Sequence, residues 1–150
     1  MMLRLGIVVV IAAGAATAVV AQSDPIAARK AEMKAMAQPI YRSLNRMQRE
    51  QDPFDAARVE ADLAQLSTSL QKLPALFPPG SMSGTNPGDE FRTSEKIWQN
   101  KADFEGRFAK LAKDVADNRD KAKTLAGLKE VYPVLRGTCD GCHQNYLVKN

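Results

Sequence analysis

The sequence predicts an all-α fold, an antiparallel up-down-up-down four-helix bundle. Apolar residues recur every three or four positions through four long segments, the spacing that gives a helix one apolar face. Pro, Gly and Asp residues separate these segments, and no stretch shows convincing strand-like alternation of apolar and polar residues. Short connections and one longer one suit consecutive antiparallel helices.

The first predicted helix begins at Asp24-Pro25, where an aspartate can cap the first turn and a proline fits the first helical position. Pro39 falls inside this helix, so we expect a kink there. The apolar stripe of the helix consists of Met33, Met36, Ile40, Leu44 and Met47.

The second predicted helix begins at Asp52-Pro53, which repeats the same cap. Its apolar stripe steps by four and three residues, as in a bundle, and consists of Val59, Leu63, Leu66, Leu70 and Leu73. A long connection follows from Leu73 to Gly88. Its many Pro and Gly residues exclude a helix over its whole length.

The third predicted helix spans residues 93–117 and the fourth spans residues 120–146. The stripe of the third consists of Ile97, Phe104, Phe108, Leu111 and Val115. The stripe of the fourth consists of Leu128, Tyr132, Leu135, Cys139, Cys142 and Tyr146. The two cysteines therefore share the face that points into the predicted core.

Residues 1–21 have the pattern of a cleaved signal peptide. Arg4 precedes the apolar run Leu5–Val20, and Val19-Val20-Ala21 fits a small-x-small cleavage site. The alternative is a permanent membrane anchor, but the run is short and Ala-rich, which favours cleavage. Residues 22–150 then form one domain in the periplasm.

The charge pattern argues against nucleic-acid binding, because the formal net charge is only +4 and no basic block contains interleaved aromatic residues. The basic excess favours encounters with an acidic partner protein. No Ser-His-Asp set, catalytic carboxylate pair or phosphate-binding loop is visible, so we expect a protein that is not an enzyme.

The most informative motif is Cys139-Asp140-Gly141-Cys142-His143. C-x-x-C-H is the attachment signature of a c-type haem. The two thiols each bond one haem vinyl group, and the histidine supplies an axial imidazole to the iron. Helical spacing places Cys139, Cys142 and His143 on one face. The motif predicts one covalent haem c inside the bundle, and export agrees with it because such haem is attached outside the cytoplasm.

Three other interpretations of the motif fit less well. A zinc site usually needs four ligands, and the chain contains only two Cys and one His. A thioredoxin-like redox pair normally opens a helix in a βαβ unit, which the pattern does not show. A structural disulfide leaves His143 unexplained.

The chain resembles the class II c-type cytochromes, which comprise the cytochromes c′ and their low-spin, methionine-ligated relatives. The resemblance runs from Arg29 to Tyr146, and the position of C-x-x-C-H near the C-terminus distinguishes it from class I. The matching features are Arg29 with Met33-Lys34, Pro53-Phe54-Asp55, Leu73-Pro74, Phe77-Pro78, Ile97-Trp98 and Cys139 to His143 with Tyr146.

The resemblance implies further site residues. Arg29 matches an arginine near a haem propionate, and Lys30 stands where a glutamine is common and could reach the haem edge. Ser94 falls where a third-helix residue often contacts the haem. A basic residue is common at the position of Leu147, so this chain departs from the pattern there. Relatives are often homodimers, which makes a homodimer one expectation.

The sixth iron ligand decides between two functions. The candidate thioethers are Met33, Met36, Met47 and Met82. The resemblance implies that Met33 is distal to His143. If Met33 binds iron, the protein is a low-spin carrier of single electrons between periplasmic or membrane-bound redox proteins. If Met33 only packs, the iron is five-coordinate and binds nitric oxide or carbon monoxide. The pattern favours the carrier.

Overall fold

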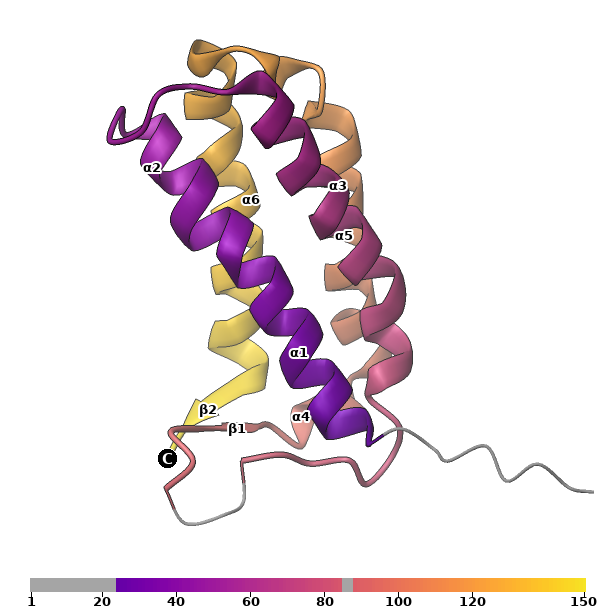
Figure 1. Cartoon of the computed structure of the whole chain (residues 1–150). Helices are drawn as coiled ribbons and strands as arrows, with labels where there is room; N and C mark the ends of the chain where they lie inside the picture. Colours follow the sequence, from indigo (N-terminus) through magenta and orange to yellow (C-terminus); the bar gives the residue numbers. More distant parts are fainter. Residues whose placement is uncertain (1–23, 85–87) are drawn as a thin grey trace, which may run out of the picture.

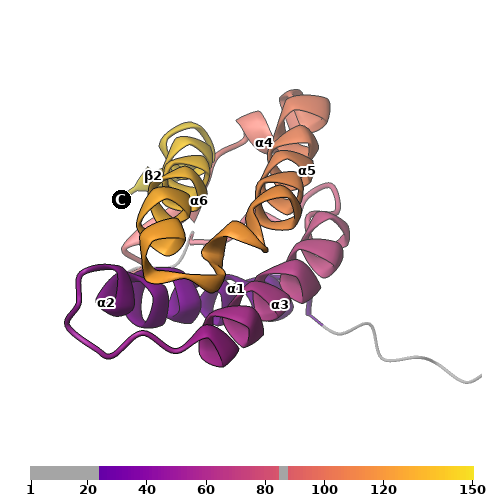
Figure 2. The same ribbon diagram turned by 90° about the horizontal axis from the view of Figure 1, so that it is seen from above.

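The structure, a computed structural model, describes residues 24–84 and 88–150, and the predicted signal peptide lies outside them. These residues form a four-helix bundle, which confirms the predicted fold (Figure 1). Seen along its axis, the bundle has its long helices around a common interior (Figure 2). No helix in the described ranges combines the length and apolar character that a membrane crossing requires.

The first arm of the bundle runs through three helical stretches, α1 (Pro25–Gln38), η1 (Pro39–Leu44) and α2 (Asn45–Gln48). The Asp24 carboxylate accepts a hydrogen bond from the Ile26 N–H at 2.9 Å, which confirms the predicted cap. The middle stretch η1 is a π-helix that begins at Pro39, where the sequence predicts a kink. A proline lacks the N–H that an α-helix requires, and the wider turn accommodates this loss.

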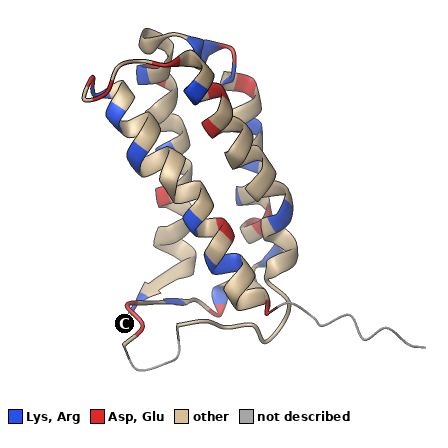
Figure 3. Ribbon diagram, viewed as in Figure 1, with Lys and Arg blue, Asp and Glu red and all other residues tan. Residues whose placement is uncertain are grey.

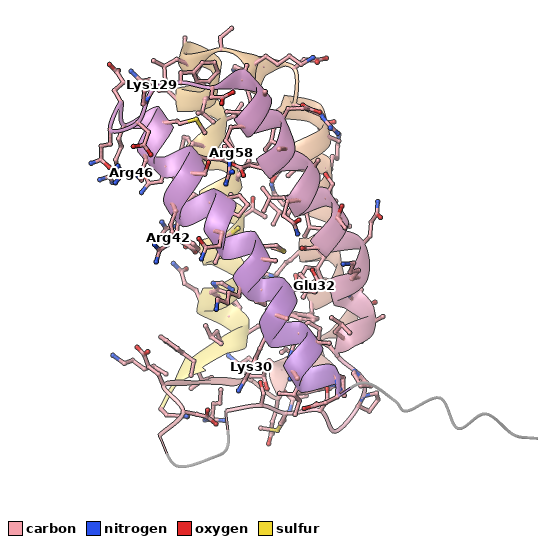
Figure 4. The ribbon with its side chains drawn as sticks, viewed as in Figure 1. Lys30, Glu32, Arg42, Arg46, Arg58 and Lys129 are labelled. Atoms are coloured by element: carbon pink, nitrogen blue, oxygen red, sulfur yellow. The ribbon has the colours of Figure 1, made fainter. Side chains whose placement is uncertain are left out.

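The second arm is α3 (Ala56–Lys72), followed by the 3-10 turn η2 (Leu73–Leu76). The prediction that this helix begins at Asp52 was wrong. Asp55 caps it by accepting from the Arg58 N–H at 3.0 Å. The Asp52 carboxylate instead accepts two hydrogen bonds of 2.7 Å from Arg46, which Figure 4 labels on α2. Asp52 therefore belongs to the turn between the arms.

The third segment is not the single helix that we predicted over residues 93–117. It consists of the strand β1 (Phe91–Thr93), the short helix α4 (Lys96–Gln99) and the helix α5 (Lys101–Asn118), with Asn100 at the break. β1 pairs antiparallel with β2 (Leu147–Lys149), so the expectation of no strands was also wrong. Three residues are too few for a period-two pattern to be recognised.

The fourth arm is α6 (Leu125–Tyr146), which follows the 3-10 turn η3 (Lys121–Lys123). Its cap is Thr124, whose hydroxyl accepts from the Gly127 N–H at 3.1 Å, so the helix begins later than the predicted start at residue 120. The predicted end of the helix at Tyr146 is confirmed.

One apolar core joins the four arms, and the Lys, Arg, Asp and Glu residues are interspersed along the bundle (Figure 3). The apolar described residues buried most completely are Leu44, Leu66, Leu73, Ala122, Leu128 and Leu135. α6 packs along α5 and crosses η1 and α2, but it makes little contact with α1. α1 and the C-terminal half of α6 therefore diverge toward the bottom of Figure 1, and the candidate site lies where they separate.

The corner between η3 and α6 depends on Gly127. A Cβ atom at this position would lie 1.8 Å from the Lys121 carbonyl oxygen, so the corner must shift to accept any side chain. Gly127→Ala should lower the free energy of unfolding by about 1–3 kcal/mol in urea denaturation. Gly106 on α5 is the matched control, because a Cβ there meets nothing within 4 Å. Gly106→Ala should stabilise by about 0.5–1 kcal/mol. Equal effects of the two substitutions would contradict this packing.

Candidate haem-binding site

The C-x-x-C-H segment (Cys139–His143) lies in the last turns of α6. Cys139 and Cys142 are half-buried, pack against the core and are free thiols. The helix places both thiols and the imidazole of His143 on the wall of one cavity. This is the arrangement that attachment of one haem through two thioethers and an axial histidine requires.

Two adjoining cavities lie between α1 and α6. The upper cavity is the one that Cys139 lines, and the lower cavity is the one that Arg29 lines. They have Met33, Ala37, Cys142 and His143 in common, so they lie on either side of the same four residues. The upper cavity has a volume of about 70 Å³ and the lower a volume of about 380 Å³. The lower cavity alone is within the range that is typical of sites for small molecules and cofactors.

The two cavities have different linings. The upper one is mainly apolar, with Met36 and Ile40 from the first arm and Phe108 and Leu111 from α5. The lower one has apolar walls, but among the described residues its lining also includes four cations and no carboxylate. These cations are Arg29, Lys30, Lys34 and Arg92. A flat apolar ring with anionic groups at one edge, which is the chemistry of haem, fits this pair of cavities.

Arg29 is buried and lines the lower cavity, where it is fixed by contacts with the connection after α3. It donates hydrogen bonds to the Leu76 carbonyl at 3.3 Å and to the Ser81 carbonyl at 2.7 Å. Its guanidinium also lies 4.5 Å from the centre of the Phe77 ring. Burial lowers the pKa of Arg29, against a smaller opposing effect of Asp24. The cation is therefore fixed in place beside the cavity before any anion binds.

Lys30 and Ser94 differ in their access to the cavities. Lys30 lines the lower cavity from α1, and its ammonium lies 4.0 Å from the Asp89 carboxylate at the solvent side (Figure 4). Ser94 is buried, but it lines neither cavity; its hydroxyl accepts from the Lys96 N–H at 3.3 Å. Its neighbour Thr93 lines the lower cavity instead. Haem contact by Ser94 stays a prediction.

The structure distinguishes the four candidate methionines by position. Met33 lines both cavities opposite the C-x-x-C-H segment, and Met36 lines the upper cavity only. Met47 and Met82 line neither. Of the candidates, Met33 therefore has the position that a ligand facing His143 would need.

Burial keeps the two attachment thiols and the His143 imidazole neutral. It raises the pKa of Cys139 to about 11, and it raises the pKa of Cys142 against a smaller lowering by Arg107. Burial also lowers the pKa of His143. At neutral pH the imidazole is thus in its uncharged form, which is the form that donates a lone pair to a metal.

Sequence reasoning missed two arginines beside the segment, each of which pairs with an aspartate four residues away on its own helix, Asp103 for Arg107 and Asp140 for Arg136. Arg107 on α5 donates to the Gly141 carbonyl at 3.0 Å, and Arg136 on α6 donates to Asp140 at 2.8 and 2.9 Å. The Arg136 guanidinium also lies 4.3 Å from the centre of the Tyr41 ring. The only signal in the sequence was i, i+4 spacing of opposite charges, which is typical of ordinary surface pairs.

Comparisons with known proteins agree with this site. The family model described as Cytochrome C' matches residues 24–147. Cytochrome c′ of Rhodopseudomonas palustris is 38% identical over 130 residues, covering 87% of this chain and 86% of the relative. Cytochrome c-556 of the same organism is 34% identical over 142 residues, covering 91% and 94%.

A solved structure shows the same fold. The structure of cytochrome c′ from Rhodopseudomonas palustris superposes with a TM-score of 0.76 at 35% identity, covering 86% of this chain and 99% of that one. The family match, the relatives and the fold agree along nearly the whole described chain. The chain belongs to the cytochrome c′ family, whose members carry a covalently attached haem c.

Proposed function

We propose that this protein is a periplasmic carrier of single electrons. One observation supports the proposal above the others: His143 and Met33, from the diverging helices α6 and α1, line the same cavities. An imidazole and a thioether on opposite faces are the axial pair of electron-transferring c-type cytochromes. Bound haem would supply an iron centre that gains and loses one electron.

The residues of the chain have distinct roles in this proposal. The Cys139 and Cys142 sulfurs would hold the haem covalently, and the His143 nitrogen and the Met33 sulfur would be available to its iron. The apolar walls exclude water, which raises the cost of charge at the iron and so favours the reduced state. Arg29 and Lys30 are placed to balance anionic groups at the haem edge.

The proposed location and partners follow from the two ends of the chain. Residues 1–21 direct export and are removed, and haem attachment at the C-x-x-C-H segment takes place in the periplasm. Lys30 and Lys34 are exposed where they line the lower cavity. They would attract acidic surfaces of periplasmic or membrane-bound redox proteins. A homodimer is compatible with this role.

A second candidate function is binding of nitric oxide or carbon monoxide at an open distal site. The observation that favours it is the upper cavity, which continues from Met33 along Met36 and Ile40. If the Met33 sulfur packs against this wall without binding iron, a diatomic molecule could enter on the distal side. Both functions fit the family.

Covalent attachment can be tested on the purified holoprotein. It should retain its colour after acid-acetone extraction, and its mass should equal residues 22–150 plus one haem. Cys139→Ala combined with Cys142→Ala should yield a colourless, loosely packed chain, because a native-state ligand that fills the core is lost. Circular dichroism and thermal melting measure this. A colourless wild type with a disulfide, made in a host that matures c-type cytochromes, would rule the proposal out.

Met33 ligation can be tested by absorption spectroscopy. The oxidised protein should be low-spin, with the weak charge-transfer band of a Met–Fe bond near the red edge of the visible spectrum. Met33→Ala should abolish this band and allow rapid carbon monoxide binding to the reduced protein, because a strong-field ligand is removed from the distal face.

Met36→Ala is the matched control, since Met36 lies one turn further along α1 and lines the upper cavity only. It should keep the band and the slow reaction with carbon monoxide. A wild type that is already high-spin, with a spectrum that Met33→Ala leaves unchanged, would favour gas binding over electron transfer.

A further inference from the structure

Arg107 connects α5 to the C-x-x-C-H segment. Its Nη1 donates to the Gly141 carbonyl oxygen at 3.0 Å, directly before Cys142. The same side chain lines the upper cavity together with Cys142 and His143. The Arg107 guanidinium therefore lies at the cavity wall and is hydrogen-bonded to the backbone next to Cys142 and His143, two of the predicted haem contacts.

Asp103 and Tyr146 hold this guanidinium in place. Asp103 lies one turn before Arg107 on α5 and accepts from its Nε at 2.8 Å. The Tyr146 hydroxyl donates to the same carboxylate at 2.5 Å, and the guanidinium lies 5.4 Å from the centre of the Tyr146 ring. The three side chains form a network that joins α5 to the last turn of α6.

Only one of the two charged side chains of the network lines the cavity. The Arg107 side chain is 30% exposed and lines the cavity, whereas the Asp103 side chain is 54% exposed and does not line it. Water screens the more exposed charge more strongly. The network therefore presents a net positive field to the C-x-x-C-H segment.

We propose that Arg107 is a positioning residue that fixes the C-x-x-C-H backbone and raises the reduction potential of the haem, with Asp103 as the opposing charge. The proposal rests on the attachment of haem proposed above. A fixed cation destabilises the oxidised centre more than the reduced one, because the oxidised centre carries one more positive charge. A bond to the Gly141 carbonyl holds that cation at a constant distance.

The test is a spectroelectrochemical titration of holoproteins at fixed ionic strength. Arg107→Gln keeps an N–H donor but removes the charge and leaves Asp103 without its cation. It should lower the potential by the equivalent of about a tenfold change in the redox equilibrium, about 59 mV for one electron. Asp103→Asn should shift the potential in the opposite direction by a smaller amount. Arg107→Lys keeps the charge and should stay near the wild type.

Lys113→Gln is the matched control, because it removes one positive charge from the same helix at a side chain that is 72% exposed. Its potential should stay near that of the wild type. Equal shifts in Arg107→Gln and Lys113→Gln, or shifts of the same sign in Arg107→Gln and Asp103→Asn, would overturn the inference. If Arg107→Gln does not retain haem, the upward shift expected for Asp103→Asn and the near-wild-type potential expected for Arg107→Lys still decide.

The outcomes separate this inference from the proposed function. A wild type without covalent haem would overturn both. If the wild type has covalent haem, but Arg107→Gln and Asp103→Asn both have the reduction potential of the wild type, only the role of Arg107 is overturned. Covalent haem is read from mass and colour, and the role of Arg107 is read from the potential.

Discussion

The divergence of α1 from α6 is the constraint on which the rest of the structure depends. Both helices belong to one bundle, and they are held together above by η1 and α2. Below that crossing, Met33 and His143 face a shared space that side chains of the chain do not fill. Protein interiors are normally packed as densely as organic crystals, and large unfilled spaces are costly. The bundle is therefore built around a large apolar body that it does not itself supply.

The irregular segments form the floor below this space. Arg29 joins α1 to the connection after α3 by its hydrogen bond to Ser81. Trp98, which belongs to α4, donates a hydrogen bond of 2.9 Å to the Pro78 carbonyl in the same connection. β1 and β2 then join the segment before α4 to the residues after α6. Gly84 lets the connection after α3 approach β1, because it has a φ of +80° and any Cβ there would lie 2.0 Å from the Phe91 carbonyl oxygen. Parts that look like loose connections thus fix where the site ends.

Sequence patterns predicted the helices well because burial of an apolar stripe dominates their energy. They chose the wrong cap for α3, because Asp52 and Asp55 have equal local propensity and only the contact of Asp52 with Arg46 decides between them. The C-x-x-C-H segment is recognisable because its chemistry requires neighbouring residues. The cations around the lower cavity were only partly foreseen, because Lys34 and Arg92 are brought together by folding and not by spacing in the chain.

The placement of the two thiols on the fourth arm has a consequence for biosynthesis. If the chain is exported from its N-terminus, as proposed, α1, α3 and α5 cross the membrane before Cys139 and Cys142. These three arms would then lack the haem around which they pack, and their apolar faces would be exposed and prone to aggregation. The interspersed charges on these arms would keep such an intermediate dispersed. With export in this direction, the order of the arms along the chain would make haem insertion the last event of folding.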